Sequence, residues 1–333
     1  MGPARRQGVD TLTATRALRK RFAAAAIVAA ALGTTSCAQG AGGSAEGAAS
    51  GASAVAPSTA SPASGPTSAT GSATGSATGS AATGSVTAGR RLNGVPVYWV
   101  GETARSFRLF REFRTVPDAG GRVASAIAAM TRMKPLDPDY VTPWAPASRV
   151  VTRQRGGALT VDLSADAIAG RNVGSELAER AVQQLIYTAT AAAAAAGSTP
   201  IRTVTITIDG RPADAWGVVR LGTPMTRAPQ VEVLSHAWVT SPQEGDRRRA
   251  GTVTFVGYGT SFEATFGWDV TDAAGKVVAK GFTMGGTGTG GFGSLTFTAK
   301  LRPGTYTVEL RTDDPSDGEG PGPMSDTKRF TVR

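Results

Sequence analysis

The chain has a single cysteine, Cys37, and a single histidine, His236, the residue types that most often carry nucleophilic or metal chemistry. One cysteine excludes an intramolecular disulfide. One cysteine and one histidine are too few for a zinc site built from these residues within one chain. A catalytic pair would have to join Cys37 to His236 across a stretch that we expect to be disordered. We therefore predict that the protein is not an enzyme and that His236 is structural or exposed.

Two further patterns resemble cofactor or catalytic motifs without their required surroundings. Residues 288–293 match G-x-G-x-x-G, which binds a dinucleotide only when a strand precedes it and a helix N-terminus follows it. Here SLTFTAKL follows, a strand pattern, so we predict a hairpin loop and no cofactor. Ser235 precedes His236 outside any G-x-S-x-G context, so no serine hydrolase triad is indicated.

Carboxylates occur at two places where they could bind a ligand. Asp162 ends an apolar run and is either a ligand-binding carboxylate or, as we favour, a residue that hydrogen-bonds to its own backbone. A second group, Asp313, Asp314, Asp317 and Glu319, offers oxygens of the kind that bind Ca²⁺. Pro315 and Met324 break the EF-hand spacing, so we favour a solvated acidic loop and predict no metal site. Paired carboxylates for glycoside hydrolysis depend on spatial pairing, which the sequence does not decide.

The first 36 residues have the order of an export signal. Residues 1–21 are positively charged, residues 22–33 form a short apolar run, and small residues lead to Cys37. The segment LGTTSC resembles a bacterial lipobox, with Thr34 where leucine is usual. The resemblance implies cleavage before Cys37 and its lipidation, and acyl chains would hold the protein at a membrane surface. The alternatives are a secreted protein with a free cysteine and an uncleaved anchor.

Residues 37–91 have the composition of a tether. They are nearly all glycine, alanine, serine and threonine, as in GSATGSATGSAATGS. Such a segment buries too little apolar surface to offset chain entropy, so we expect disorder. A flexible coil of about 55 residues spans roughly 40 Å, which would hold the folded part away from the membrane. Its serine, threonine and proline content also suits O-glycosylation.

The basic charge of the chain is unevenly distributed. The formal net charge is +10, but six basic residues and one acidic residue precede Cys37, so the remainder carries +5. This weakens a nucleic-acid interpretation, and no nucleic-acid partner is predicted. The run Arg247–Arg249 and the series Arg105, Arg108, Arg111 and Arg114 could attract anionic wall polymers or lipid headgroups. We favour solvated faces for both.

Residues 92–222 predict an α+β domain, a mixed sheet with helices on one face. Strands are expected at 94–100, 109–116, 149–154, 158–164, 203–210 and near 215–219, with a loop at 134–146. One helix is expected at 121–133, and a longer one from a Ser175 cap to Gly197.

The segments VPVYWV, LFREFR, ALTVDLS, AERAVQQLIYTAT and VTITIDGRPA carry a family likeness in this order. They resemble the sporulation and germination domain called GerMN. The resemblance implies a fold like the ring-building motif of secretion and sporulation assemblies. It also implies a non-catalytic envelope domain that acts in scaffolding or partner binding; ring assembly is an analogy at the level of the fold.

Residues 228–333 predict an all-β sandwich of immunoglobulin type. Strands are expected at 230–234, 252–257, 262–271, 276–283, 293–301, 304–312 and 327–332. Tyr306 fits a tyrosine corner, and the expected core includes Trp238, Phe255, Phe266, Trp268 and Phe297. The segments SFEATFGWDVTDAAGKVV, GFGSLTFTAKL, PGTYTVEL and DDPSDGEG, in this order, resemble the immunoglobulin-like domain of bacterial spore germination called Gmad2.

Two function classes remain from the sequence. The first is a lipid-anchored envelope scaffold or protein-binding module, in sporulation, germination or envelope assembly. The alternative is a module that binds cell-wall glycan through exposed aromatic and arginine side chains. A wall hydrolase is a weaker third hypothesis that rests only on location. The expected partners are the membrane, through Cys37, and an unidentified envelope protein or wall polymer; the oligomeric state stays open.

Overall fold

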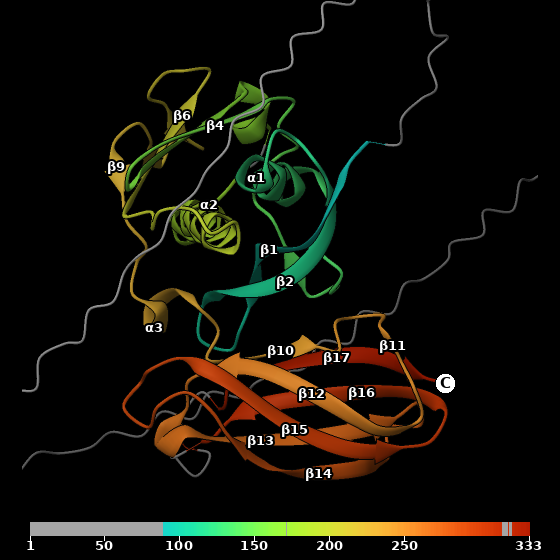
Figure 1. The fold of residues 1–333 in the computed structure, drawn as a ribbon. Helices are drawn as coiled ribbons and strands as arrows, with labels where there is room; N and C mark the ends of the chain where they lie inside the picture. The colour runs from blue at the N-terminus through green and yellow to red at the C-terminus, as the bar shows by residue number, and fades with distance from the viewer. Residues whose placement is uncertain (1–88, 171, 315–318, 320–321) are drawn as a thin grey trace, which may run out of the picture. The chain divides into compact units, whose positions relative to one another are not determined.

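The computed structural model describes residues 89–170, 172–314, 319 and 322–333. The predicted signal 1–36, Cys37, almost all of the predicted linker 37–91, and Asp317 lie outside the described residues. What is described belongs to one compact unit and consists of two successive domains (Figure 1). Within these residues no helix has the length and apolar character needed to cross a bilayer.

The first domain alternates strands and helices. Its elements are β1 (Arg91–Glu102), β2 (Phe107–Pro117), α1 (Arg122–Arg132), β3 (Tyr140–Val141), β4 (Val150–Arg155), β5 (Ala158–Leu163), a 3₁₀ turn (Ala165–Ile168), α2 (Ser175–Ala195), β6 (Thr203–Ile208), β7 (Asp214–Ala215), β8 (Val219–Arg220), β9 (Pro224–Met225) and α3 (Gln230–Val233). The predicted α+β class is confirmed.

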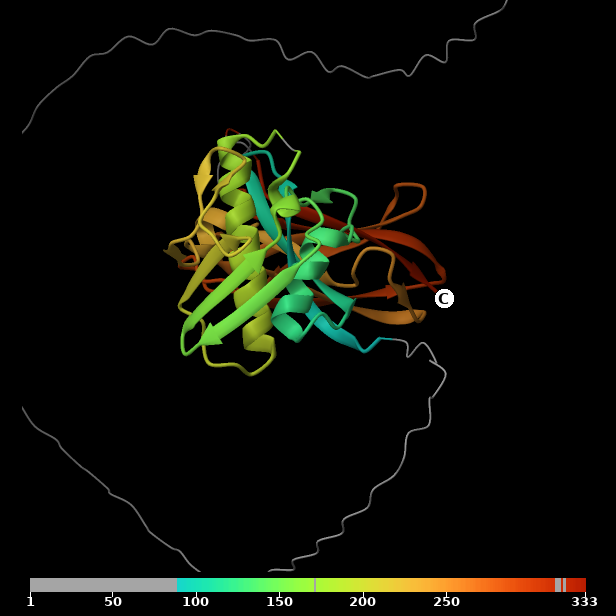
Figure 2. The same ribbon diagram turned by 90° about the horizontal axis from the view of Figure 1, so that it is seen from above.

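The strands of the first domain divide between two main sheets. One has the order β2-β1-β3, and the other has the order β4-β5-β6-β9, while β7 and β8 form a separate pair. The second sheet is mixed, because β5 pairs antiparallel with β4 and parallel with β6. Helices α1 and α2 lie between the two sheets, so each sheet has the helices on one face (Figures 1 and 2).

Burial differs between the two sheets. In β5 and β6 buried residues alternate with more exposed ones, as expected for a sheet with one covered face. In β1 every residue from Val95 to Gly101 is buried, so both faces of this strand are covered. The helices cover one face, and the second domain contacts the other through the junction described below.

The ends of α2 test two predictions. Ser175 is the first helical residue and not the cap; Gly174 occupies the cap position, and no side chain caps the helix. The prediction of a Ser175 cap was therefore wrong, because the extended backbone that a cap requires falls one residue earlier. The C-terminus is as predicted: Gly197 has φ +69°, and the Ser198 N–H donates to the Ala193 carbonyl at 3.1 Å.

The second domain is a sandwich of two sheets. Its elements are β10 (Ala237–Ser241), β11 (Arg247–Arg248), β12 (Gly251–Gly259), a 3₁₀ turn (Phe262–Ala264), β13 (Thr265–Asp272), β14 (Val277–Met284), β15 (Gly293–Leu301), β16 (Gly304–Thr312) and β17 (Ser325–Val332). One sheet has the order β10-β12-β15, and the other has the order β11-β17-β16-β13-β14. The predicted all-β immunoglobulin-like class is confirmed.

The start of this domain differs from the prediction. Residues 230–234 were expected to form a strand, but Gln230–Val233 form α3 and the first strand is β10. Pro229 immediately precedes the helix, and the Leu234 N–H donates to the Gln230 carbonyl at 2.8 Å. A short run of alternating apolar residues does not distinguish a strand from a single helical turn.

The sandwich core contains four of the five predicted aromatic residues. Phe297 stacks on Phe255 and on Trp268, with ring centroids 4.9 and 4.6 Å apart, and Phe266 is fully buried. The Tyr306 hydroxyl donates to the Arg302 carbonyl at 3.0 Å, so the predicted tyrosine corner is present. The fifth residue, Trp238, is also fully buried, but it packs in the core of the first domain.

Candidate functional site at the domain junction

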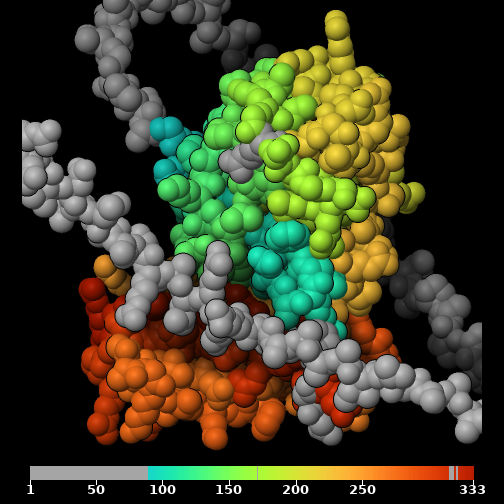
Figure 3. Space-filling model, turned by 180° about the vertical axis from the view of Figure 1, so that it is seen from behind, coloured from blue at the N-terminus to red at the C-terminus, as the bar shows by residue number. Residues whose placement is uncertain are grey.

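The two domains meet along β2 and β10. Trp238 of β10 is completely buried and belongs to the same apolar cluster as Trp99 and Leu109 of the first domain. The backbone is joined as well, since the Ser235 N–H donates to the Leu109 carbonyl at 3.0 Å. The space-filling view in Figure 3 shows the cyan region of β1 and β2 against the orange and red second domain. The junction is therefore an extension of the first core.

Polar clamps fix the rim of the junction. The Gln243 side chain accepts from the Phe113 N–H at 2.7 Å and donates to the Phe113 carbonyl at 2.9 Å, as a neighbouring strand would. At the other end, Arg105 donates to the Gly322 carbonyl at 3.1 Å. These contacts join parts of the chain that are distant in the sequence.

A buried ionic cluster lies beside the apolar contact. Lys328 of β17 donates from its Nζ to Asp137 Oδ2 at 2.5 Å, to Asp326 Oδ1 at 2.6 Å and to the Tyr140 hydroxyl at 2.7 Å. Asp137 and Tyr140 come from the first domain, whereas Asp326 and Lys328 come from the second. All four residues are between 2% and 6% exposed. We call these four residues the junction cluster.

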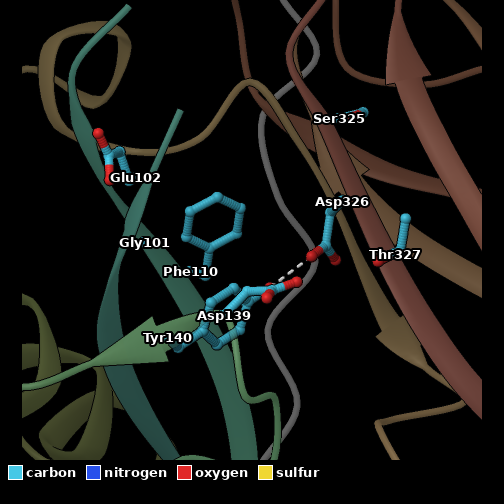
Figure 4. A pocket seen from close by; sticks show the side chains of 8 residues that line it. All are labelled: Gly101, Glu102, Phe110, Asp139, Tyr140, Ser325, Asp326 and Thr327. Carbon is cyan, nitrogen blue, oxygen red and sulfur yellow. Dashed lines mark hydrogen bonds between the residues drawn. The ribbon is translucent and has the colours of Figure 1, made fainter. Parts of the chain in front are cut away.

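Both carboxylate oxygens of Asp326 accept further hydrogen bonds. The Tyr140 hydroxyl donates to Asp326 Oδ1 at 2.6 Å, and the Val239 N–H donates to Asp326 Oδ2 at 2.8 Å. The Tyr140 ring stacks on Phe110, with centroids 4.6 Å apart. Figure 4 shows Tyr140 and Asp326 approaching each other from the two domains. Buried charges are tolerated only when they are paired and hydrogen-bonded in this way.

A second buried pair positions the loop that carries Asp137. Glu112 of β2 is 2% exposed and accepts from the N–H groups of Leu136 and Asp137. Arg114 donates to Glu112 at 2.8 Å and to the Lys134 carbonyl at 2.9 Å. These bonds fix the start of the proline-rich loop 134–146, and they place Asp137 beside Lys328.

The electrostatics of the junction cluster follow from two carboxylates that share one ammonium. Burial raises the pKa of Asp326, and the attraction of Lys328 offsets only part of this rise. Burial alone would lower the pKa of Lys328, but Asp326 and Asp137 together raise it. Burial and the two nearby carboxylates hold the pKa of Tyr140 well above its ordinary value. Lys328 is therefore cationic and Tyr140 is neutral at pH 7.

The arginine series on and before β2 takes part in the junction. Arg108 donates to the Val231 carbonyl at 2.7 Å, Arg114 is buried with Glu112, and Arg105 reaches Gly322. The Arg111 guanidinium lies over the rings of Phe113 and Tyr258, at 5.0 and 5.1 Å. Arg105 is exposed, as expected, whereas Arg108 and Arg111 are half-buried and Arg114 is buried, so the expectation of a solvated face was wrong for these three.

An open cavity of about 400 Å³ adjoins the junction cluster. Glu102, Phe110, Asp139, Tyr140 and Asp326 contribute to its lining, and Figure 4 shows all eight lining residues. In the described ranges no group of three or more histidine, cysteine, aspartate or glutamate side chains is placed to hold a metal ion. The residues of the junction cluster connect the two domains.

The remaining candidates from the sequence lie apart from the junction cluster. Asp162 accepts from the Thr207 hydroxyl and the Gly210 N–H, both at 2.7 Å, and pairs with Arg149. It braces β6 and the turn after it, and the prediction of bonds to its own backbone was wrong in the choice of partner. Burial tends to raise the pKa of Asp162, but the bonds from Arg149, Thr207 and Gly210 lower it overall.

His236, the glycine motif and the acidic loop show no catalytic geometry in the part of the chain that is described. His236 Nε2 lies 3.0 Å from the Val231 carbonyl, and burial lowers the pKa of its imidazole. The glycine motif 288–293 leads directly into β15, as the strand pattern predicted, but the predicted hairpin was wrong, because β14 and β15 lie in different sheets. The Asp313 N–H is bonded to the Ser261 hydroxyl at 3.0 Å. Arg248 pairs with Asp246, while Arg249 is exposed.

The junction cluster was not predicted from the sequence, although one pattern in β17 indicates it. Alternation along β17 places Asp326 and Lys328 on the same face as the core residues Phe330 and Val332. The strand was expected only from residue 327, which left Asp326 outside it. Charged residues on the inward face of a strand must have partners, and here the partners come from another domain.

Family comparisons identify both domains. Residues 96–214 match the Germane family, described as sporulation and spore germination. Residues 236–319 match Gmad2, described as the immunoglobulin-like domain of bacterial spore germination. The chain contains a Germane domain followed by a Gmad2 domain. Both predicted resemblances are thereby confirmed, and the Germane–Gmad2 junction is the site described above.

Other comparisons add less. No curated protein matches the Germane–Gmad2 chain. Among solved structures, CopC from Methylosinus trichosporium OB3b is 26% identical over 29% of this chain and 93% of its own, with a TM-score of 0.22. The CARDB domain of the PF1109 protein from Pyrococcus furiosus is 12% identical over 29% and 84%, with a TM-score of 0.20. The PapD-like domain 7 of human CEP192 is 14% identical over 34% and 92%, with a TM-score of 0.17. These scores are too low to carry an argument.

Proposed function

We propose that the Germane–Gmad2 protein is a non-catalytic, lipid-anchored scaffold of the cell envelope whose two domains act as one rigid protein-binding unit. The observation that carries this proposal is the junction cluster, in which Lys328 of one domain is buried against Asp137 and Tyr140 of the other. Both families are described in terms of sporulation or spore germination, which supports a role in that process or in envelope assembly.

Rigidity is the property that links the junction to scaffolding. Contacts between domains of one chain are usually polar and permit relative motion. Here Trp238 is fully buried in the shared core, and separating the domains would expose it together with the ionic cluster. A unit of this kind presents surfaces of both domains at a fixed distance, as a scaffold requires.

The edge strand β14 is the favoured surface for a protein partner. It ends the five-stranded sheet, and its side chains Phe282 and Met284 are 77% and 71% exposed. Val277 and Val278 are also exposed, at 47% and 43%. An edge strand offers unpaired backbone groups to an added strand, while side chains such as these supply apolar contacts.

Partner binding is tested with the full-length protein in its host membrane, with a photocrosslinker at position 282. The comparison includes wild type, Met284→Glu, and Lys300→Glu as a control at an exposed position on β15. We expect a discrete protein adduct in wild type and in the control, and its loss in Met284→Glu. Retention on purified wall with no protein adduct would overturn the scaffold.

The anchor is tested separately, through the intact mass of the membrane-extracted protein beside Cys37→Ala. We expect a mature N-terminus at Cys37 that carries acyl mass, and release of Cys37→Ala from the membrane. An unmodified, freely released wild-type protein would overturn the anchor. The partner experiment retains its meaning in that case, because β14 lies far from Cys37 in the sequence.

A further inference from the structure

A second cavity at the junction has a different electrostatic character. It measures about 250 Å³, and Tyr98, Arg111, Phe113, Arg227, Gln230 and Tyr258 contribute to its lining. We call it the arginine cavity. Two guanidinium groups line it and no carboxylate does. Its volume lies just below the usual range of small-molecule sites, ~300–1,000 Å³, so it suits a ligand of about one ring.

Arg111 presents an unusual set of contacts. Its guanidinium lies over three aromatic rings, at 5.0 Å from Phe113, 5.1 Å from Tyr258 and 6.0 Å from Tyr98. The buried Nε of Arg111 has no hydrogen-bond partner among the described residues. This Nε is covered by protein atoms, so a ligand in the cavity would meet the terminal Nη groups of Arg111, whose N–H donors suit an anion.

Arg227 is held at the same cavity by fixed contacts. Its guanidinium lies 4.5 Å from the Tyr187 ring, its Nε donates to Thr190 Oγ1 at 2.6 Å, and its Nη2 donates to the Tyr187 carbonyl at 3.3 Å. All of these partners are neutral. By contrast, Arg149 and Arg311 form ion pairs with carboxylates. Within the described residues, the positive charge of the arginine cavity is not compensated by an ion pair.

We infer that the arginine cavity binds the anionic group of a charged sugar unit. Two guanidinium groups match a carboxylate or phosphate, and arginine binds both in a bidentate manner. Tyr258 and Gln230 are polar residues of the lining whose hydroxyl and amide groups would suit sugar hydroxyls, and Phe113, 38% exposed, offers a ring to an apolar sugar face. This site is independent of the scaffold role, because it does not include β14.

Calorimetry on the full-length protein in detergent tests the inference with four probes: glucuronic acid, glucose 6-phosphate, glucose and inorganic phosphate. We expect at least one charged sugar to bind at least tenfold more tightly than both glucose and inorganic phosphate. Tighter binding of glucuronic acid would indicate a carboxylate-bearing glycan, and tighter binding of glucose 6-phosphate a phosphate-bearing one; both support the inference.

Variants locate the binding. Arg111→Gln and Arg227→Gln should each weaken binding about 10-fold or more, as expected when a charged hydrogen bond is lost. The matched control is Arg249→Gln at an exposed arginine outside the cavity, which should change the affinity less than twofold. If Arg111→Gln does not fold, Arg227→Gln decides the outcome, because Arg227 does not belong to the group formed by Arg111 and the three rings near it. Equal losses in Arg249→Gln and Arg227→Gln, or binding of neither charged sugar, would overturn the inference.

Discussion

Replacing Lys328 by methionine removes the only cation of the junction cluster while keeping most of the side-chain volume. Asp137 and Asp326 then remain buried at 2% and 6% exposure without an ammonium between them. Loss of one partner from a buried ion pair typically costs about 3–5 kcal/mol, because the remaining charge is uncompensated. With a urea dependence of roughly 3 kcal/mol per molar for a unit of this size, the unfolding midpoint should fall by about 1 to 2 M.

The assay is urea unfolding at pH 7, followed by tryptophan fluorescence, which reports on the buried Trp99 and Trp238. Lys300→Met is the control, since Lys300 is exposed on β15 and a surface change of this kind should stay within about 0.5 kcal/mol. Adding Asp137→Asn to Lys328→Met should restore part of the loss, because one of the two unpaired charges is removed.

The pH dependence of the same variant has a definite sign. The pKa of Asp326 is already raised in the folded protein, and loss of Lys328 should raise it further. The folded state then binds a proton more tightly than the unfolded state, so stability rises on acidification. The deficit of Lys328→Met should therefore shrink between pH 7 and pH 5. An unfolding midpoint of Lys328→Met within 0.2 M of that of Lys300→Met at pH 7 would refute the reasoning.

Three further predictions concern single side chains. Trp238→Ala should destabilise the protein by about 3–5 kcal/mol in the same urea assay, because it empties a fully buried site in the shared core. Tyr306→Phe removes the bond to the Arg302 carbonyl, and thermal unfolding should report a loss of about 1 kcal/mol. Asp162 has a lowered pKa, so its contribution is present above its unfolded pKa of roughly 3.9. The stability difference between wild type and Asp162→Asn should accordingly diminish as the pH falls below about 4, and a difference that grew on acidification would contradict this.

Much of the fold follows from short-range patterns. The alternating strands β5, β6, β12, β15 and β16 fall close to their predicted ranges, because each buries one face against a single core. Gly197 ends α2 as predicted, since only a residue that tolerates positive φ fits there. The prediction for residues 230–234 was wrong because a short-range pattern does not decide the structure there. Their apolar alternation is too short to specify a strand, and tertiary contacts with β2 select one helical turn.

The junction was harder to foresee because its partners are far apart in the sequence. Lys328 and Asp137 are separated by 191 positions, and no local pattern links them. Trp238 was correctly expected to be buried but was assigned to the core of the second domain. Its apolar character does not indicate which residues it packs against. Arg111 and Arg114 were expected to face solvent on composition alone.

The strand β17 supplies both Asp326 and Lys328, and it also pairs with β16 inside the sandwich. One segment near the C-terminus of the chain thus completes the second domain and closes the junction. During synthesis the first domain emerges earlier, and Asp137 and Tyr140 lack their partners Asp326 and Lys328 until β17 is made. Assembly of the two domains therefore has a built-in order, and a chain cut before Ser325 would keep its first domain while leaving an open, protease-accessible seam.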